Sequence, residues 1–250
     1  MRGRGSTTQR DGVGGATVAA SCRLLVMDVY LEVGNKRVFA GGLEWPGWNR
    51  GGRDEERALE ALLAAAPRYA AAMTSSSPRF DPPPSADDLE VVERLTGDAT
   101  TDFGAPSIAP EADGRPVDSR ELVRLQTLLE MSWKALDRAA EAAEGVELAT
   151  GPRGGGRSLD AIVGHVVGAE VSYLGRLASP RPKIDEADPG AALEEVRTAV
   201  QEALTRAVQE GLPEAGPRGG AIWLPRYFVR RTVWHALDHA WEIEDRSPTA

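Results

Sequence analysis

The sequence predicts an α+β protein in which a small β-sheet with one helix precedes an up-down bundle of four helices. Two observations predict this fold class. Residues 24–43 hold two β-forming segments around a Gly-Asn turn, and the chain after residue 118 divides into four helical segments between Gly- and Pro-rich breaks. A chain of 250 residues has room for both parts. The expected organisation is a disordered tail, an α/β domain, a linker and a helical bundle, at residues 1–22, 23–98, 99–117 and 118–250.

The expected α/β domain begins with a β-hairpin. Residues 24–33 and 37–43 are rich in β-forming side chains, and Gly34-Asn35 supplies the turn between them. A helix is predicted from Asp54, whose side chain can cap it, to Ala70. After a proline-rich connection, residues 89–95 are a further candidate strand of the same domain.

Each helix of the expected bundle has a start signal or an apolar stripe. The first helix begins after Asp118, and the Ser158 side chain can cap the second helix. Pro225 suits the first turn of the fourth helix, because the missing N–H of proline costs nothing there. The four helices are predicted at residues 119–144, 158–177, 191–210 and 225–246.

Composition excludes several classes of function. The formal net charge is −9, which argues against nucleic acid as a partner because phosphate binding requires a basic surface. No apolar run is long enough to span a membrane. A single cysteine, Cys22, rules out an internal disulfide and fits the reducing cytoplasm. We therefore expect a cytoplasmic protein that acts on a small molecule, with either Met1 or Met27 as its first residue.

All three histidines of the chain fall into a pattern typical of metal ligands. His235 and His239 are four residues apart, so a helix places both imidazoles on one face. His165 lies on a different predicted helix and can complete a set of three nitrogen donors. Three imidazoles without a carboxylate suit Zn²⁺, with Ni²⁺ and Fe²⁺ as alternatives. The other interpretation is that the three rings are hydrogen-bonded in the core or half exposed.

The surroundings of the histidines favour an accessible site. Gly164 and Gly168 flank His165 and leave room for a cavity or for close approach of a second helix. Asp238 and Glu242 are candidates to orient the imidazole rings through hydrogen bonds. Either residue could equally be a surface or structural acid. No residue beside the histidines is an evident general base, so the catalytic residues stay unassigned.

The helical half of the chain resembles the DinB-like superfamily. The resemblance rests on His165 in the second helix and on the stretch 234–243 (WHALDHAWEI) in the fourth, and it covers about residues 118–247. Glu170 and Tyr173 also suit the family's pattern for the second helix. The superfamily includes thiol-dependent S-transferases and mycothiol-dependent maleylpyruvate isomerases. The resemblance implies that all three histidines bind a divalent metal, and it implies much less about the reaction.

Residues 24–72 resemble HicB-like antitoxin domains. The matching segments are Val38-Phe39-Ala40, Pro46-Gly47-Trp48 and the stretch 52–59 (GRDEERAL). Such domains are small β-sheets with a packed helix. The usual antitoxin adds a DNA-binding segment, which this chain lacks, so the resemblance implies a fused structural or interaction module.

These features lead to several hypotheses for the function. A metal-bound thiol would be deprotonated and would suit a thiol-dependent transferase or isomerase acting on a small electrophile. A metal-bound water would instead make the protein a hydrolase. The further alternatives are a non-catalytic ligand-binding or stress-response module with a structural metal, and a toxin–antitoxin component.

The first hypothesis also needs a place for a low-molecular-weight thiol. Arg226, Arg230 and Arg231, at the start of the fourth helix, are candidates to bind its carboxylate. The alternative is that all three are solvated surface charges. A homodimer is compatible with a bundle that carries an attached β-domain.

Overall fold

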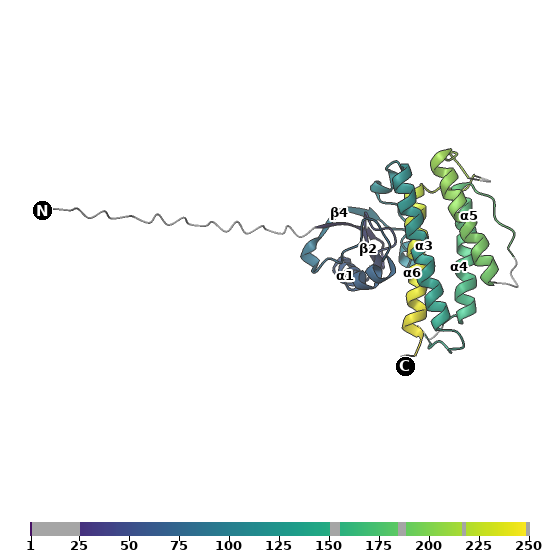
Figure 1. Ribbon diagram of the computed structural model, residues 1–250, viewed down its shortest axis with the longest axis horizontal. Coiled ribbons are helices and arrows are strands. Elements are labelled where there is room, and N and C mark those ends of the chain that lie inside the picture. The colour runs from purple at the N-terminus through teal and green to yellow at the C-terminus, as the bar shows by residue number, and fades with distance from the viewer. Residues whose placement is uncertain (2–25, 151–155, 185–188, 217–218, 249–250) are drawn as a thin grey trace.

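The computed structural model describes residues 1, 26–150, 156–184, 189–216 and 219–248. The chain forms a sheet-and-helix module beside a group of four long helices (Figure 1). The expected disordered tail, apart from Met1, lies outside the described residues, and so does Cys22. Among the described helices, none is long and apolar enough to cross a membrane.

The module contains one four-stranded sheet with the order β3-β2-β1-β4. Strands β1 (Met27–Val33) and β2 (Val38–Gly42) form an antiparallel hairpin, which confirms the first two predicted strands. Strand β4 (Leu89–Thr96) confirms the third and pairs with β1 in parallel. The parallel pairing requires a crossover between the two strands, and the crossover includes helix α1.

Strand β3 (Asn49–Gly52) was not predicted from the sequence. Its four residues, Asn-Arg-Gly-Gly, have little intrinsic β-propensity. The strand exists because it pairs antiparallel with β2 and because Asn49 is buried, where its amide donates to the Tyr30 hydroxyl over 2.6 Å. Tertiary contacts thus override the local preference.

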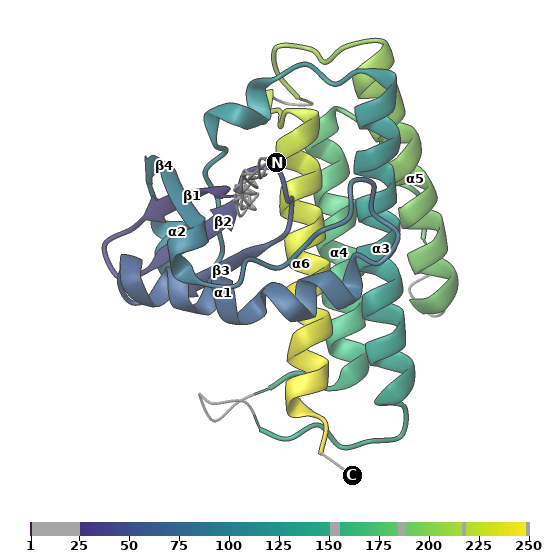
Figure 2. The same ribbon diagram turned by 60° about the vertical axis from the view of Figure 1, so that its left-hand side comes forward.

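Helix α1 (Glu55–Ala72) packs on the sheet. It begins as expected at Asp54, whose side chain accepts a hydrogen bond from the Arg57 backbone N–H. Tyr69, on its buried face, packs with Trp48 and Phe80 from the loops of the module. The ring centroid of Phe80 lies 4.8 Å from that of Tyr69 and 5.0 Å from that of Trp48. Figure 2 shows the helix crossing toward the long helices.

The C-terminal part consists of four helices that pack together, which confirms the α+β fold class. Their bounds agree with the predicted segments to within a few residues, except that the second ends earlier and a 3₁₀ turn, η3 (Gly175–Leu177), follows it. The four helices are α3 (Ser119–Ala142), α4 (Leu159–Leu174), α5 (Pro189–Gln209) and α6 (Pro225–Arg246).

The directions of these helices do not alternate strictly, as an up-down bundle would require. The first turns of α3 and α6 lie together, joined by an ion pair between Glu121 and Arg226, so these two helices run in parallel. Helix α4 runs antiparallel to α6, because His165 lies against His239 and Tyr173, further along α4, lies against the earlier His235. Helix α5 runs antiparallel to α3. Helices α4 and α5 therefore point the same way (Figure 2). The prolines after α4 marked a connection in the sequence, but they could not indicate its path.

The segment expected to be a linker, residues 99–117, is ordered and packs against the sheet. It contains the short helix α2 (Ala99–Phe103) and the 3₁₀ turn η2 (Glu111–Gly114). The fully buried Glu32 carboxylate of β1 accepts hydrogen bonds from the backbone N–H groups of Ser107 and Ile108. These bonds hold the segment against the sheet, which a flexible linker would not need.

A buried ion pair joins the module to helix α6. The Arg230 guanidinium donates to both carboxylate oxygens of Asp113 over 2.7 and 2.8 Å, and it also donates to the carbonyl oxygens of Gly42 and Leu43. Nearby, Gly47 has a φ of 88°, and a Cβ at that position would lie 2.3 Å from the Val233 side chain. Only glycine permits both the left-handed backbone and this close approach to α6.

Replacing Arg230 by Ala should destabilise the protein strongly. The substitution leaves the Asp113 carboxylate buried and unpaired, which typically costs about 3–5 kcal/mol. Urea unfolding followed by circular dichroism measures the change. Arg57→Ala is the matched control, because Arg57 pairs with Glu60 on the exposed side of α1 and should leave the midpoint nearly unchanged. Equal midpoints for the two variants would contradict a structural role for the buried pair.

Helix α4 buries a carboxyl group inside the bundle. Glu170 is 1 % exposed, and the Trp133 indole N–H donates to its Oε1 over 2.8 Å. Its Oε2 has no hydrogen-bond partner among the described residues. Burial raises the pKa of Glu170 from 4.5 to about 7, so the protonated form is the one that the fold favours.

The variant Glu170→Gln should alter how stability depends on pH. Because the folded pKa is raised, the stabilising contribution of the proton is present below pH 4.5 and is lost as pH rises through about 7. The neutral amide keeps that contribution at high pH, so the variant should exceed the wild type at pH 8 by about 3 kcal/mol and match it near pH 4. Urea unfolding across this range checks the result, with the exposed Glu130→Gln as control. Parallel pH profiles for wild type and Glu170→Gln would refute this account.

Candidate metal centre

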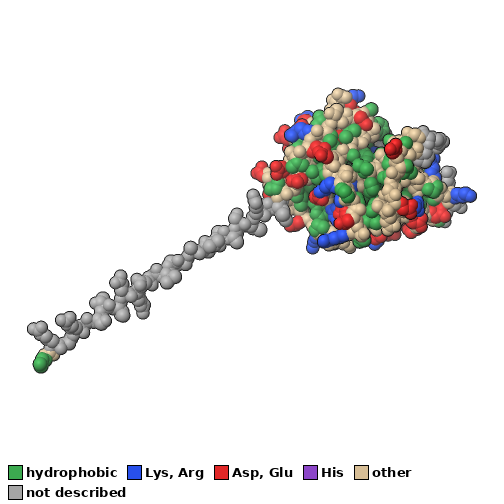
Figure 3. Space-filling model, turned by 90° about the horizontal axis from the view of Figure 1, so that it is seen from above, with side chains coloured by type: hydrophobic (Ala, Val, Ile, Leu, Met, Phe, Trp, Pro, Cys, Tyr) green, Lys and Arg blue, Asp and Glu red, His purple; other side chains and the backbone are tan. Residues whose placement is uncertain are grey.

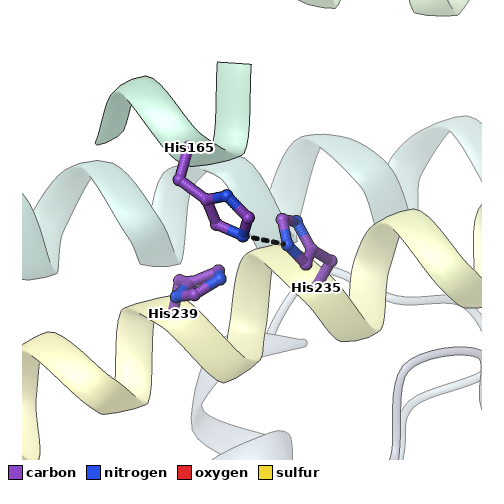
Figure 4. Close-up of side chains that lie close together, drawn as sticks. All are labelled: His165, His235 and His239. Carbon is purple, nitrogen blue, oxygen red and sulfur yellow. Dashed lines mark hydrogen bonds between the residues drawn. The ribbon is translucent and has the colours of Figure 1, made fainter. Parts of the chain in front are cut away.

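The three histidines of the chain meet at the contact between α4 and α6 (Figure 4). His165 comes from α4, and His235 and His239 come from successive turns of α6. The Nε2 atoms of His165 and His235 face each other across 3.2 Å. One ring nitrogen from each histidine lies within 4.8 Å of the others, as metal ligands must.

The spacing of these nitrogens suits a divalent metal. In a tetrahedral site with zinc–nitrogen bonds of 2.0–2.1 Å, two ligand nitrogens stand about 3.3 Å apart. The separation of 3.2 Å between His165 Nε2 and His235 Nε2 is close to that value. An octahedral metal with three ligands on one face needs nearly the same spacing, so the geometry indicates a metal without selecting zinc, nickel or iron.

The Glu242 carboxylate orients the His239 ring so that its Nε2 atom is available to bind a metal. Glu242 Oε2 lies 2.8 Å from His239 Nδ1, and the other carboxylate oxygen accepts a hydrogen bond from Arg246 over 2.8 Å. A proton on Nδ1 leaves Nε2 of the same ring with a free lone pair that points toward the other two histidines. Carboxylates that hold ligating histidines in this way are a common feature of metal sites.

Arg246 fixes that carboxylate in turn. Its guanidinium also donates to the backbone carbonyl oxygens of Ala149 and Arg157, which both lie in the connection between α3 and α4. Arg246 was not among the site residues predicted from the sequence. The spacing of three and four residues in His239, Glu242 and Arg246 was the signal for this chain of contacts.

The cluster is buried on one side and open on the other. His235 and His239 are 6 % and 7 % exposed, whereas His165 is exposed. A Cβ added to Gly164 or Gly168 would meet no described atom within 4 Å, so the surface of α4 beside His165 is not covered by the described residues. A structural metal site is usually closed by protein ligands, while a catalytic site keeps a position open.

The environment keeps two of the imidazoles neutral. Burial lowers the pKa of His235 to about 2, and the charges of His239 and Arg231 act in the same direction. Burial also lowers the pKa of His165, with a smaller contribution from His239. Only the neutral ring offers a lone pair, so these shifts favour the form that binds a metal.

The structure gives Asp238 another partner than the expected histidine ring. Its carboxylate accepts a hydrogen bond from Arg50 of the module over 3.0 Å. The Arg50 guanidinium also stacks 3.9 Å from the centre of the Trp241 ring. Asp238 lies three residues after His235 but projects toward the module, so it helps to dock the sheet and does not orient an imidazole.

Two of the three arginines proposed for thiol binding are engaged elsewhere. Arg230 is buried in its pair with Asp113. Arg226 pairs with Glu121 and donates to backbone carbonyls of the segment before α3. Arg231, by contrast, lies one turn before His235, with its guanidinium carbon 4.6 Å from the centre of the Trp234 ring. The structure therefore leaves Arg231 as the candidate nearest to the histidines.

Aromatic side chains flank the histidines on the side of Arg231. The ring of Tyr173, from α4, lies 5.9 Å from the ring of His235 and 5.0 Å from the ring of Trp223. On the face drawn in Figure 3, acidic, basic and apolar side chains are interspersed. The neighbourhood of His235 combines the aromatic ring of Tyr173 with the positive charge of Arg231, and the charge of Arg157 also acts on His235.

Comparison with known proteins gives no match to a family model, to a curated protein or to a solved structure. The structure itself shows a mixed four-stranded sheet with a helix, followed by four helices that carry a cluster of three histidines.

Removing the carboxylate of Glu242 should weaken metal binding without abolishing it. Loss of a partner that orients a ligating histidine typically lowers affinity 10–100-fold. Competition with a chromophoric chelator measures the Zn²⁺ affinity of Glu242→Ala. Glu244→Ala is the matched control, because Glu244 lies on the same helix but pairs with Arg68 at the surface. Equal affinities for the two variants would show that Glu242 does not support the site.

Proposed function

We propose that the protein is a metal-dependent enzyme of the DinB-like type, in which His165, His235 and His239 hold one divalent ion, with Zn²⁺ as the first candidate. Its reaction is the transfer or isomerisation of a small electrophile with the help of a low-molecular-weight thiol. The observation that carries the proposal is the convergence of three imidazole nitrogens within 4.8 Å, beside a surface of α4 that the described residues leave uncovered.

The acidic residues near the cluster support thiol chemistry over hydrolysis. A metal-bound thiol loses its proton outright, so the protein need not supply a base. A hydrolase usually adds a general base to its metal-bound water. Glu242 is held by His239 and Arg246, and Asp238 is held by Arg50, so neither is free for that role. A metal held by the three histidines would supply the activation of a nucleophile that these two carboxylates do not offer.

The N-terminal module serves in this proposal as a fused HicB-like support for helix α6. Its contacts with Arg230, Asp238 and Val233 hold the side of the helix that faces away from His165. These contacts keep the two histidines of α6 in a fixed register toward α4. The proposal takes a small molecule as the substrate and assigns no role to nucleic acid or to a membrane.

Metal content and thiol binding together test this function. Protein purified without chelator should contain about one equivalent of divalent metal. The variants His165→Ala and His239→Ala should lose most of it, while Asp160→Ala, an exposed acid on α4, should retain it. The metal-loaded protein should bind simple thiols in calorimetry and accelerate their reaction with a chromogenic electrophile such as 1-chloro-2,4-dinitrobenzene.

Three outcomes separate the proposal from its alternatives. Metal kept at wild-type stoichiometry in both histidine variants would refute the site. Metal that is bound without any thiol binding or turnover would refute the transferase and favour a structural metal. Hydrolysis of an activated ester by the loaded protein, without any effect of thiols, would favour a hydrolase.

A further inference from the structure

Arg231 carries an N–H group for which the described part of the chain provides no acceptor. Its Nη1 atom is buried and has no hydrogen-bond partner among the described residues. Every other arginine of helix α6 is paired: Arg226 with Glu121, Arg230 with Asp113, and Arg246 with Glu242. A buried donor without an acceptor costs free energy, so an unpaired guanidinium at this place is an exception that calls for a ligand.

Aromatic rings hold the Arg231 guanidinium in position without satisfying it. The guanidinium carbon lies 4.6 Å from the centre of the Trp234 ring and 5.9 Å from the centre of the Tyr173 ring. Such contacts stabilise the cation, but a ring face does not replace an oxygen acceptor. The planar fork of N–H groups is thereby fixed in advance, and its geometry matches a carboxylate.

The position of Arg231 relates it to the candidate metal centre. It lies four residues before His235, so both side chains leave the same face of α6 about one helical turn, or roughly 5.4 Å, apart. Tyr173 links the two, since its ring lies 5.9 Å from that of His235 and also from the Arg231 guanidinium. One small molecule can therefore reach both groups.

We infer, on the basis of the metal-dependent function proposed above, that the thiol used by this protein carries a carboxylate and that Arg231 binds it. The thiol sulfur reaches the metal, and the carboxylate pairs with the guanidinium. A mercaptocarboxylic acid with two or three carbons between sulfur and carboxylate spans about one helical turn. This inference names the chemical class of the thiol, which the histidines alone do not.

The test uses Co²⁺-loaded protein, because a thiolate bound to Co²⁺ gives a charge-transfer band in the near ultraviolet. Titration with 3-mercaptopropionate and with 3-mercapto-1-propanol compares two thiols that differ only in the carboxylate. The acid should bind at least about tenfold more tightly, as expected for a charge-assisted pair. Arg231→Gln should remove the difference while the Co²⁺ stoichiometry stays at that of the wild type, and Arg231→Lys should retain part of it.

Arg157→Gln is the matched control. Arg157 is an exposed cation just before α4, and its charge also acts on His165. This variant should keep the preference for the acid. Should the preference disappear here and persist in Arg231→Gln, the binding residue would be Arg157 and the inference would be overturned.

The outcomes keep this inference apart from the function on which it rests. Absence of Co²⁺ binding by the wild type would refute the metal site itself. Binding of Co²⁺ and of both thiols with equal affinity would overturn the carboxylate inference alone and leave the metal-dependent function standing. The wild-type comparison decides this point even if Arg231→Gln fails to fold.

Discussion

The burial of helix α6 on both sides is the constraint on which the rest of the structure depends. The sheet module covers one face, α3 and α4 cover the other, and most of its residues are inaccessible to solvent. Polar groups in such a helix must find partners inside the protein. Arg230 finds Asp113, Asp238 finds Arg50, and His239 finds Glu242. These pairs fix the rotation of α6 and with it the direction of its histidines.

Three buried polar atoms of α6 have no hydrogen-bond partner among the described residues: Arg231 Nη1, Trp234 Nε1 and His235 Nδ1. The Trp234 ring packs with Phe39 of the module, whereas Arg231 and His235 lie beside the candidate site, where His235 Nε2 faces His165. A metal ion and an anionic ligand would use the free lone pairs and the free N–H groups that the fold leaves over. At the candidate site, a bound ligand would therefore satisfy polar groups of α6 that have no partner among the described residues.

Much of this arrangement could be predicted from the sequence, because local patterns carry it. The hairpin, strand β4 and the four long helices follow from β-propensity, helical periodicity and capping residues, and the spacing of His235 and His239 follows from helix geometry. Strand β3 could not be predicted, because its polar and glycine residues gain their conformation from pairing with β2. The roles of Asp238 and Arg230 could not be predicted either. Their partners, Arg50 and Asp113, lie more than 100 residues away in the chain.

X-ray absorption spectroscopy at the metal edge of protein purified without chelator tests the central claim most directly. The account predicts a first shell containing three imidazole nitrogens, with the multiple-scattering pattern of histidine and, for zinc, bonds of about 2.0–2.1 Å. Addition of a thiol should bring one sulfur into that shell at about 2.3 Å. A shell of oxygen atoms without imidazole, or one that keeps its histidine pattern in His165→Ala and His239→Ala protein, would contradict a metal centre built from these three residues.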